Sequence, residues 1–583
     1  MKKVKLFLFF FLLISVASFA QNATFQVNSQ KINQLLKFIN DAYLDTVNFN
    51  VLVEKGVVEM LKELDPHSAY ISKKDVQQAN EPLIGSFDGI GVTFQIIKDT
   101  INVMEVIVNG PSEKVGLKAG DKIIKVDTAI ACGKHVNNKW VADHLRGPKG
   151  TKVSVFVKRG RNPELLEFNI TRDKIPMNSI NVYFMADKNT GYICLERFAQ
   201  TSAQEFRDAL TRLKARGLKN LILDLRGNTG GYLQAAFEIA NEFIGDNKMI
   251  VYTDNFRKTG EQFKSNSRGE FRKGRLVVLV DEGSASASEI VSGAVQDWDR
   301  ALVLGRRTYG KGLVQKPIYL ADGSQIRLTI SKYYTPSGRC IQRPYEDGLD
   351  SYLDDLNERA KHGELLTPDS IKFPDSLKYK TAKGRTVYGG GGIMPDIFIP
   401  LDTSRYSSLY NEMVRKGIIS SFALDYMEEN REKLKTQYAT MEDFKYNFEI
   451  SDQLFGDLMN FAHTEGVKDL VDLQFSKRVQ QFVKDKSKDL DSLYNSLEDI
   501  NNYAQFQEML KEFVTESFNE SMRLRNLNKA NEFIKDALKY EFARNLFSYG
   551  EARQIFLMKD EGFIKAMEVI NNDKIFKRFN VEQ

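Results

Sequence analysis

Residues 280–290 read Val-Asp-Glu-Gly-Ser-Ala-Ser-Ala-Ser-Glu-Ile, a turn of small residues between two apolar segments. The segment before the turn, from Leu276 to Val280, is wholly apolar and indicates a buried strand. The segment after it, from Glu289 to Val295, is typical of a helix. A strand, a tight turn and a helix place a side chain at the mouth of a sheet, with backbone N–H groups behind it, as nucleophile-bearing turns do. A run of helix-capping serines remains the alternative explanation.

A serine hydroxyl is a poor nucleophile without a base, and the usual base is histidine. A Ser-His-Asp arrangement is disfavoured in this chain but stays open, because such triads assemble across long sequence gaps. None of the five histidines lies between residues 176 and 340; they are His67, His135, His144, His362 and His463. Lys311 lies between two glycines after an apolar strand at 301–304. An exposed lysine has a pKa of about 10.4, and desolvation can lower that pKa by roughly 3–5 units. We therefore expect Lys311 to be the base, with a solvated loop lysine as the alternative.

Residues 283–290, followed by Tyr309-Gly310-Lys311-Gly312-Leu313-Val314-Gln315, resemble the signature of the carboxy-terminal processing (tail-specific) serine peptidases. That family uses a Ser-Lys dyad. The resemblance implies that Ser286 is the nucleophile and Lys311 the general base, and that Gln315 orients the lysine amine by a hydrogen bond. Ser284 and Ser288 match flanking positions and are expected to be turn and cap residues.

A second turn carries two adjacent glycines. Residues 221–225 are apolar and strand-like, Arg226-Gly227-Asn228-Thr229-Gly230-Gly231 follows, and a helix is predicted from residue 232 to 244. The resemblance assigns a glycine here to the oxyanion hole, with the N–H of Ala287 as its partner; Gly230 is favoured and Gly231 stays open. A phosphate-binding loop would need GxxxxGK[ST], and the lysine is lacking. A plain tight turn is the remaining alternative.

From about residue 86 the apolar period changes to two, and residues 86–173 look like a PDZ domain. The turn Gly89-Ile90-Gly91-Val92 offers backbone N–H groups to a C-terminal carboxylate, and the strand after it accepts the peptide as an added strand. By resemblance, Arg146 helps to sense the bound peptide.

These patterns divide the chain into five parts. Residues 1–20 are a signal peptide, 21–85 an N-terminal helical region, 86–173 the PDZ domain, 174–400 the serine protease core and 401–583 a C-terminal helical extension. The strand–turn–helix units predict a mixed α/β core, and the resemblance implies the ClpP/crotonase-like type. Residues 343–383 are polar and are expected to be a mobile surface insertion. His67, beside an Asp-Pro turn, is expected to have a structural role.

Composition limits the partners. Lys and Arg number 82 against 77 Asp and Glu, a formal net charge of +5, and no basic tract indicates nucleic-acid binding. Three cysteines do not describe a disulfide framework, and the absence of CxxC or histidine-rich spacing in the sequence predicts no metal site. The reaction that the resemblance implies needs no cofactor.

The first twenty residues have a basic start, a short apolar run and small residues at Ser18-Phe19-Ala20. This pattern is typical of a secretory signal peptide removed near Ala20, with a membrane anchor as the alternative. We therefore expect an exported protein of the periplasm or cell envelope.

Together, the sequence predicts an exported serine endopeptidase that recognises protein C-termini through its PDZ domain and cleaves polypeptides through an acyl-enzyme. Its expected partners are polypeptides with exposed C-termini, and a homo-oligomer, an adaptor protein and a peripheral membrane association stay open. The alternative is a non-catalytic PDZ scaffold or adaptor in the cell envelope.

Overall fold

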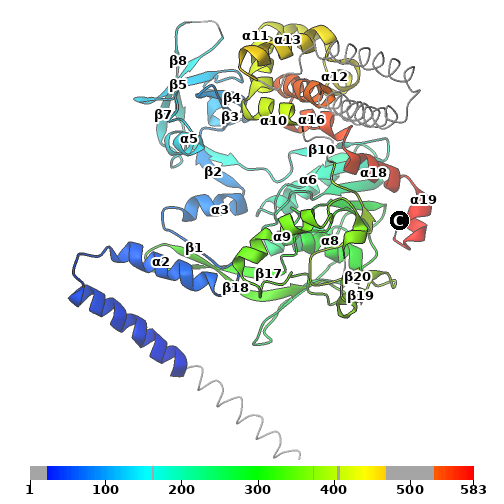
Figure 1. Ribbon diagram of the computed structural model, residues 1–583. Helices are drawn as coiled ribbons and strands as arrows, with labels where there is room; N and C mark the ends of the chain where they lie inside the picture. Colours follow the sequence, from blue (N-terminus) through cyan, green and yellow to red (C-terminus); the bar gives the residue numbers. More distant parts are fainter. Residues whose placement is uncertain (1–22, 161–162, 372, 403–406, 468–530, 583) are drawn as a thin grey trace, which may run out of the picture. The chain divides into compact units, whose positions relative to one another are not determined.

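The computed structural model describes residues 23–160, 163–371, 373–402, 407–467 and 531–582 (Figure 1). The predicted signal peptide therefore lies outside the described residues. The chain divides into two compact units, each described here by itself: Met1–Val76 with Gln315–Thr329, and Gln77–Val314 with Ile330–Gln583. Within the described ranges, no helix has both the length and the apolar character needed to cross a bilayer.

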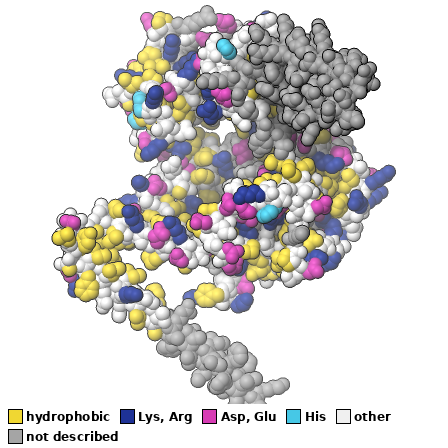
Figure 2. Space-filling model, viewed as in Figure 1, with side chains coloured by type: hydrophobic (Ala, Val, Ile, Leu, Met, Phe, Trp, Pro, Cys, Tyr) yellow, Lys and Arg dark blue, Asp and Glu magenta, His cyan; other side chains and the backbone are white. Residues whose placement is uncertain are grey.

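The first unit contains a helix at 23–42, α2 (Phe49–Lys62) and β1 (Ala69–Ile71). Strand β1 pairs antiparallel with residues 325–327 of β18 (Gln325–Tyr334). Large apolar side chains are exposed on the helices of this unit, as the yellow atoms in Figure 2 show; they include Phe25, Leu35 and Phe38. The N-terminal helical region is thus present as predicted.

The predicted PDZ domain contains a six-stranded antiparallel sheet, in which five strands follow the order β3 (Val92–Ile97), β4 (Thr100–Val106), β5 (Lys122–Val126), β7 (Lys152–Lys158) and β8 (Leu166–Thr171). The small strand β6 (Ala129–Ile130) pairs with β5, and the helices are α4 (Pro111–Lys114) and α5 (Asn138–Leu145). Alternate strand residues, such as Ile101, Val103 and Val155, form its core. Strands β2 (Ser86–Gly89) and β9 (Asp173–Pro176) pair where the chain enters and leaves the domain.

The predicted protease core is built on a six-stranded sheet, in the order β10 (Val182–Met185), β11 (Thr190–Cys194), β12 (Asn220–Asp224), β15 (Leu276–Val280), β16 (Leu302–Gly305) and β21 (Ile397–Phe398). Only the β10–β11 pair in this sheet is antiparallel, so the predicted mixed α/β class is confirmed. Three helices pack on one face: α6 (Ser202–Lys214), α7 (Leu233–Asn241) and α8 (Ala287–Asp297).

The other face of this sheet is covered by the last helices of the chain, α18 (Glu561–Ile570) and α19 (Asp573–Arg578) (Figure 1). Successive residues of β15 alternate between the two faces, so that Val278 contacts the α6–α8 layer while Val277 and Leu279 contact the α18–α19 layer. Parallel strands are buried on both faces and need two covering layers. The boundary predicted at residue 400 therefore separates these helices from the sheet that they complete.

The rest of the C-terminal region forms a separate helical bundle with its own core. It consists of α10 (Ser408–Arg415), α11 (Ile418–Gln437), α12 (Met441–Asn447), α13 (Asp452–Thr464) and a helix at 531–546, followed by α16 (Tyr549–Ala552) and α17 (Gln554–Leu557). Leu424 of this bundle packs on Ile97 and Met104 of the PDZ sheet.

Seven further helices and strands lie at other points along the chain. They are α3 (Val76–Ile84), β13 (Met249–Asp254), β14 (Gln262–Lys264), β17 (Leu313–Tyr319), α9 (Leu349–Lys361), β19 (Lys378–Lys380) and β20 (Thr386–Tyr388). The prediction of a surface insertion at 343–383 is wrong for α9, because Tyr352 and Arg359 are buried. The guanidinium of Arg359 donates to the carbonyls of Arg307 and Thr308, so this helix supports the loop before Lys311.

Candidate active site

The turn between β15 and α8 holds Ser286 in a strained conformation. Its φ of 54° and ψ of −110° lie where a non-glycine residue is rarely found. Ser284 and Ser288 are buried, and their hydroxyls donate to the carbonyls of Leu225 (2.8 Å) and Asn228 (2.7 Å). Ser286 is partly exposed, so among these three serines it alone is accessible to a reactant.

The carboxylate of Glu289 joins the turn that carries Ser286 to the loop that carries Lys311. Its Oε2 accepts from the N–H of Ser286 (2.8 Å) and from the N–H of Lys311 (2.9 Å). Its Oε1 accepts from the N–H of Gly310 (2.7 Å) and from the hydroxyl of Thr308 (2.5 Å). Burial raises the pKa of this carboxyl, and the four hydrogen bonds oppose that shift. One side chain thus fixes the distance between two backbone segments 25 residues apart (311 minus 286).

Tyr333 of β18 makes a second link between the same two segments. Its hydroxyl donates to the carbonyl of Lys311 (2.8 Å) and lies 3.1 Å from the carbonyl of Ser286. Burial raises the pKa of Tyr333 well above its ordinary value, so the hydroxyl stays protonated and remains a donor. The backbones of Ser286 and Lys311 are therefore held together by two independent side chains, and Lys311 itself is half-buried.

The glycine turn after β12 lies against the turn that carries Ser286. Gly230 has a φ of 100°, and a Cβ placed on it would lie 2.7 Å from the carbonyl oxygen of Ala285 and 2.9 Å from the Cβ of Ser286. Only glycine permits this approach. In this conformation the N–H of Gly230 donates to the Oδ1 of Asn228 (2.9 Å). Its role as an oxyanion donor with Ala287 stays a prediction, and Gly231 stays open.

Two polar residues at the start of this turn were not singled out from the sequence. Asp224, at the end of β12, is buried and accepts from the guanidinium of Arg226 and from the hydroxyl of Tyr192 (2.7 Å). Burial alone would raise the pKa of Asp224, but the charge and hydrogen bonds of Arg226 hold it below its usual range. A charged residue that ends an apolar strand was the available signal.

Gln315 belongs to the first unit, where its side-chain amide donates to the carbonyl of His67. The backbone N–H of His67 donates to Asp65 (2.8 Å), so the turn is hydrogen-bonded at this position. The structural role expected for this histidine stays a prediction. The expected hydrogen bond from Gln315 to the lysine amine stays a prediction.

The turn at residues 89–92 is held in place by hydrogen bonds to its carbonyl groups. The carbonyl of Ile90 accepts from the N–H and hydroxyl of Ser112 (3.1 and 2.7 Å), and that of Gly91 accepts from the N–H of Ile107 (2.9 Å). Gly89 ends β2 and Val92 begins β3, which is the end strand of its sheet. The edge of β3 opposite β4 is the one to which a peptide strand can be added.

Arg146, the residue after α5, forms an ion pair with Glu81 of α3. Its guanidinium lies 4.4 Å from the centre of the Phe87 ring. A role for Arg146 in sensing peptide stays a prediction. Among the residues that the structure describes, no cluster of three or more His, Cys, Asp or Glu side chains is arranged to hold a metal ion.

Comparisons with known proteins match three segments. Residues 189–349 match peptidase family S41, residues 89–170 match the PDZ domain, and residues 409–479 match a family of unknown function. The chain is 34% identical over 334 residues to the carboxy-terminal processing protease CtpB of Bacillus subtilis (strain 168), a match that covers 55% of this chain and 68% of that protein.

Two further proteins resemble the chain. A probable CtpA-like serine protease of Staphylococcus aureus (strain MRSA252) is 34% identical over 322 residues, covering 55% of this chain and 64% of that protein. A solved structure named photosystem II D1 C-terminal processing protease has 24% identity and a TM-score of 0.34, covering 64% of this chain and 88% of that chain. The match thus spans about two thirds of the two bacterial relatives.

Proposed function

Because the chain belongs to the carboxy-terminal processing proteases of peptidase family S41, we propose that it is an endopeptidase with a Ser286–Lys311 dyad. One observation carries this assignment: Glu289 and Tyr333 each bind the backbone of both residues. A dyad requires its two members to be held at a constant separation. A non-catalytic scaffold has no need of such a double link.

The proposed reaction proceeds through an acyl-enzyme. The hydroxyl oxygen of Ser286 attacks the amide carbonyl while the neutral amine of Lys311 takes the hydroxyl proton. The C–N bond then breaks, and the same amine returns the proton to the leaving nitrogen. The N–H groups of Ala287 and of Gly230 stabilise the oxyanion, which requires the Gly230 N–H to turn from Asn228. Water hydrolyses the ester, and no cofactor takes part.

Substrate recognition is assigned to the PDZ domain. The carboxylate of a polypeptide C-terminus binds at residues 89–92, and the residues before it pair with the open edge of β3. Arg146, held between Glu81 and Phe87, lies on the same domain and responds to this binding. The substrates are therefore polypeptides with exposed C-termini.

Export is proposed from residues 1–20 alone, whose charge and apolar pattern are those of a secretory signal. The protein would then act in the periplasm or cell envelope. A homo-oligomer, an adaptor protein and a peripheral membrane association remain predictions.

The test is cleavage of an unfolded polypeptide with an apolar C-terminus by purified protein spanning residues 21–583, followed by mass spectrometry. Ser286→Ala and Lys311→Ala should each abolish the products without changing the unfolding midpoint. Ser331→Ala and Lys332→Ala, which change the same residue types on β18, serve as matched controls and should cleave normally. Intact substrate with the parent protein, or full activity in Ser286→Ala, would refute the assignment and favour a scaffold.

A further inference from the structure

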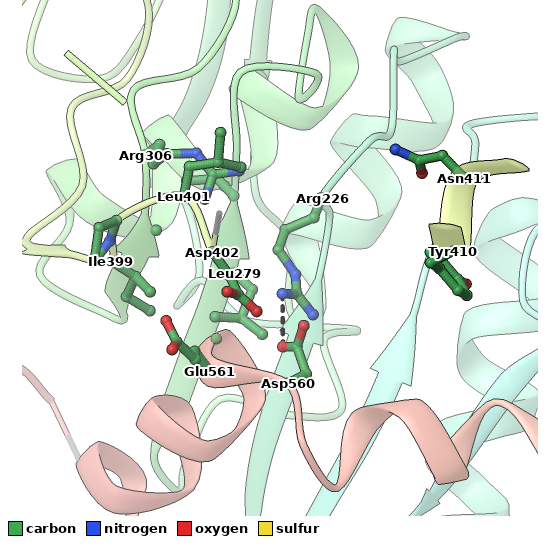
Figure 3. Close-up of a pocket in the computed structure, with 14 residues that line it drawn as sticks. Arg226, Leu279, Arg306, Ile399, Leu401, Asp402, Tyr410, Asn411, Asp560 and Glu561 are labelled. Atoms are coloured by element: carbon green, nitrogen blue, oxygen red, sulfur yellow. Dashed lines mark hydrogen bonds and ion pairs between the residues drawn. The ribbon is translucent and has the colours of Figure 1, made fainter. Parts of the chain in front are cut away.

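We propose that Asp560, in the C-terminal segment, is a positioning residue for the oxyanion turn at residues 226–231. The inference rests on the proposed function, since it concerns the same catalytic step. Asp560 precedes α18, the helix that packs on the second face of the protease sheet. Its side chain lies at the edge of the sheet where the strand before the nucleophile turn ends (Figure 3).

The guanidinium of Arg226 is held between two carboxylates. Its Nε and Nη2 donate to the Oδ1 (3.0 Å) and Oδ2 (2.7 Å) of Asp224, and its Nη1 donates to the Oδ1 of Asp560 (2.8 Å). The dashed line in Figure 3 marks the last of these contacts. A planar guanidinium with both ends bound has one orientation. Strand β12 supplies one end of this clamp, and the C-terminal segment supplies the other.

The start of α18 is shaped to receive this arginine. Asp560 caps the helix by accepting from the N–H of Phe563 (2.7 Å), so the carboxylate that binds Arg226 is itself fixed. Two residues later, a Cβ placed on Gly562 would lie 2.6 Å from the Nη1 of Arg226. A side chain at position 562 would therefore displace the guanidinium. Two independent features thus favour the contact between Arg226 and Asp560: the charge of Asp560 attracts the guanidinium, and the small size of Gly562 leaves room for it.

Arg226 is the first residue of a turn that is bound to the nucleophile turn at several points. The N–H of Gly227 donates to Asp281 (2.8 Å), and the carbonyl of Asn228 accepts from the N–H of Ala285 (3.0 Å) and from the hydroxyl of Ser288. A shift of Arg226 would therefore move the turn that carries Gly230 relative to Ser286. Reaction rates are sensitive to displacements of about 1 Å at such a site.

A cavity of about 350 Å³ beside Arg226 leaves room for a different conformation of its side chain. Glu561 and Arg306 also line it, as Figure 3 shows. The exposed carboxylate of Glu561 offers an alternative partner to the guanidinium. The ion pair with Asp560 keeps the Arg226 side chain out of this cavity and away from Glu561. In that conformation the side chain supports the oxyanion turn.

The test compares two substitutions on this contact with one elsewhere on the same segment. Asp560→Asn keeps a good helix cap and removes the charge. Gly562→Ala should favour the helix and displace Arg226. Asp573→Asn is the matched control, because Asp573 pairs with Arg275 at the other end of β15. All three are made in the full chain, and cleavage is measured together with the unfolding midpoint.

We expect Asp560→Asn and Gly562→Ala to lower kcat by about 10- to 100-fold, less than the 10²–10³ typical of losing an oxyanion donor, with KM within about twofold. A peptide aldehyde, whose carbonyl adds the Ser286 hydroxyl and places its oxygen in the oxyanion hole, should lose affinity in parallel with kcat. Asp573→Asn should keep both values. A merely structural contact would lower stability in all three variants and leave aldehyde affinity per folded molecule unchanged.

The outcomes separate the two proposals. Cleavage that depends on Ser286 in the parent, with Asp560→Asn and Gly562→Ala both equal to Asp573→Asn in kcat and aldehyde affinity, overturns the positioning role alone. Cleavage that does not depend on Ser286 overturns the proposed function, and the positioning role with it.

Discussion

Replacing Glu289 by glutamine should disturb the separation of Ser286 and Lys311, the proposed nucleophile and base. The carboxylate accepts four hydrogen bonds, two on each oxygen. A glutamine has one accepting oxygen and one donating nitrogen, so two of the four buried donors would face another donor. Either the pair from Ser286 and Lys311 or the pair from Thr308 and Gly310 is lost.

The cost follows from these contacts. A hydrogen bond to a charged group contributes about 1.5–3 kcal/mol, so two lost bonds cost about 3–6 kcal/mol. The neutral amide avoids the burial that raises the pKa of Glu289, which offsets part of the loss. We expect the free energy of unfolding to fall by about 2–4 kcal/mol and the rate of Ser286 acylation to fall at least about 100-fold.

The assay uses a serine-directed fluorophosphonate for acylation and urea for unfolding. Trp298, at the end of α8, reports the protease core by fluorescence once Trp140 in the PDZ domain is replaced by phenylalanine. Ser292→Ala is the stability control: its buried hydroxyl donates to the carbonyl of Ser288 (2.8 Å) within α8 and is not one of the four donors to Glu289. It should cost about 1 kcal/mol and keep acylation. Normal acylation in folded Glu289→Gln would refute the coupling role.

Gly230→Ala should abolish detectable cleavage, because its Cβ would lie 2.9 Å from that of Ser286 at a φ of 100°; normal turnover would contradict this reasoning. The pKa of Asp224 is held below its unfolded value, so its contribution to stability is present above about pH 4 and lost as pH falls through its folded pKa. Urea unfolding of Asp224→Asn should therefore depend less on pH below about 4 than that of the parent, and equal slopes would exclude this account. Phe576→Ala should destabilise the protease core by about 3–5 kcal/mol, since this ring is fully buried on the second sheet face. An unchanged midpoint at Trp298 would show that α19 does not belong to the core.

The local chemistry was readable from short stretches of sequence. A strand, a turn of small residues and a helix are adjacent in the chain, so the β15–α8 turn follows from local pattern alone. The choice of Ser286 among its three serines came from the family resemblance. The PDZ domain and the mixed α/β class were also predictable, because the alternation of apolar and polar residues along a strand indicates which of its faces is buried.

The partners of these residues depended on the tertiary structure. Glu289 looked like an ordinary residue of a helix N-terminus, and its bonds to Gly310 and Lys311 arise only when β16 lies beside β15. In the sequence, Tyr333 is one of several aromatic residues in a predicted strand, and nothing there indicates its contacts with the carbonyls of Ser286 and Lys311.

The C-terminal region shows the same limit most clearly. Its helical periodicity was visible in the sequence, but the apolar face of an amphipathic helix does not indicate which surface it packs against. The sequence by itself determined the turns that carry Ser286, Lys311 and Gly230, because turn geometry is a property of a few consecutive residues. Only the tertiary structure decided that α18 closes the sheet and that Asp560 binds Arg226, because burial and ion pairing join residues 334 positions apart.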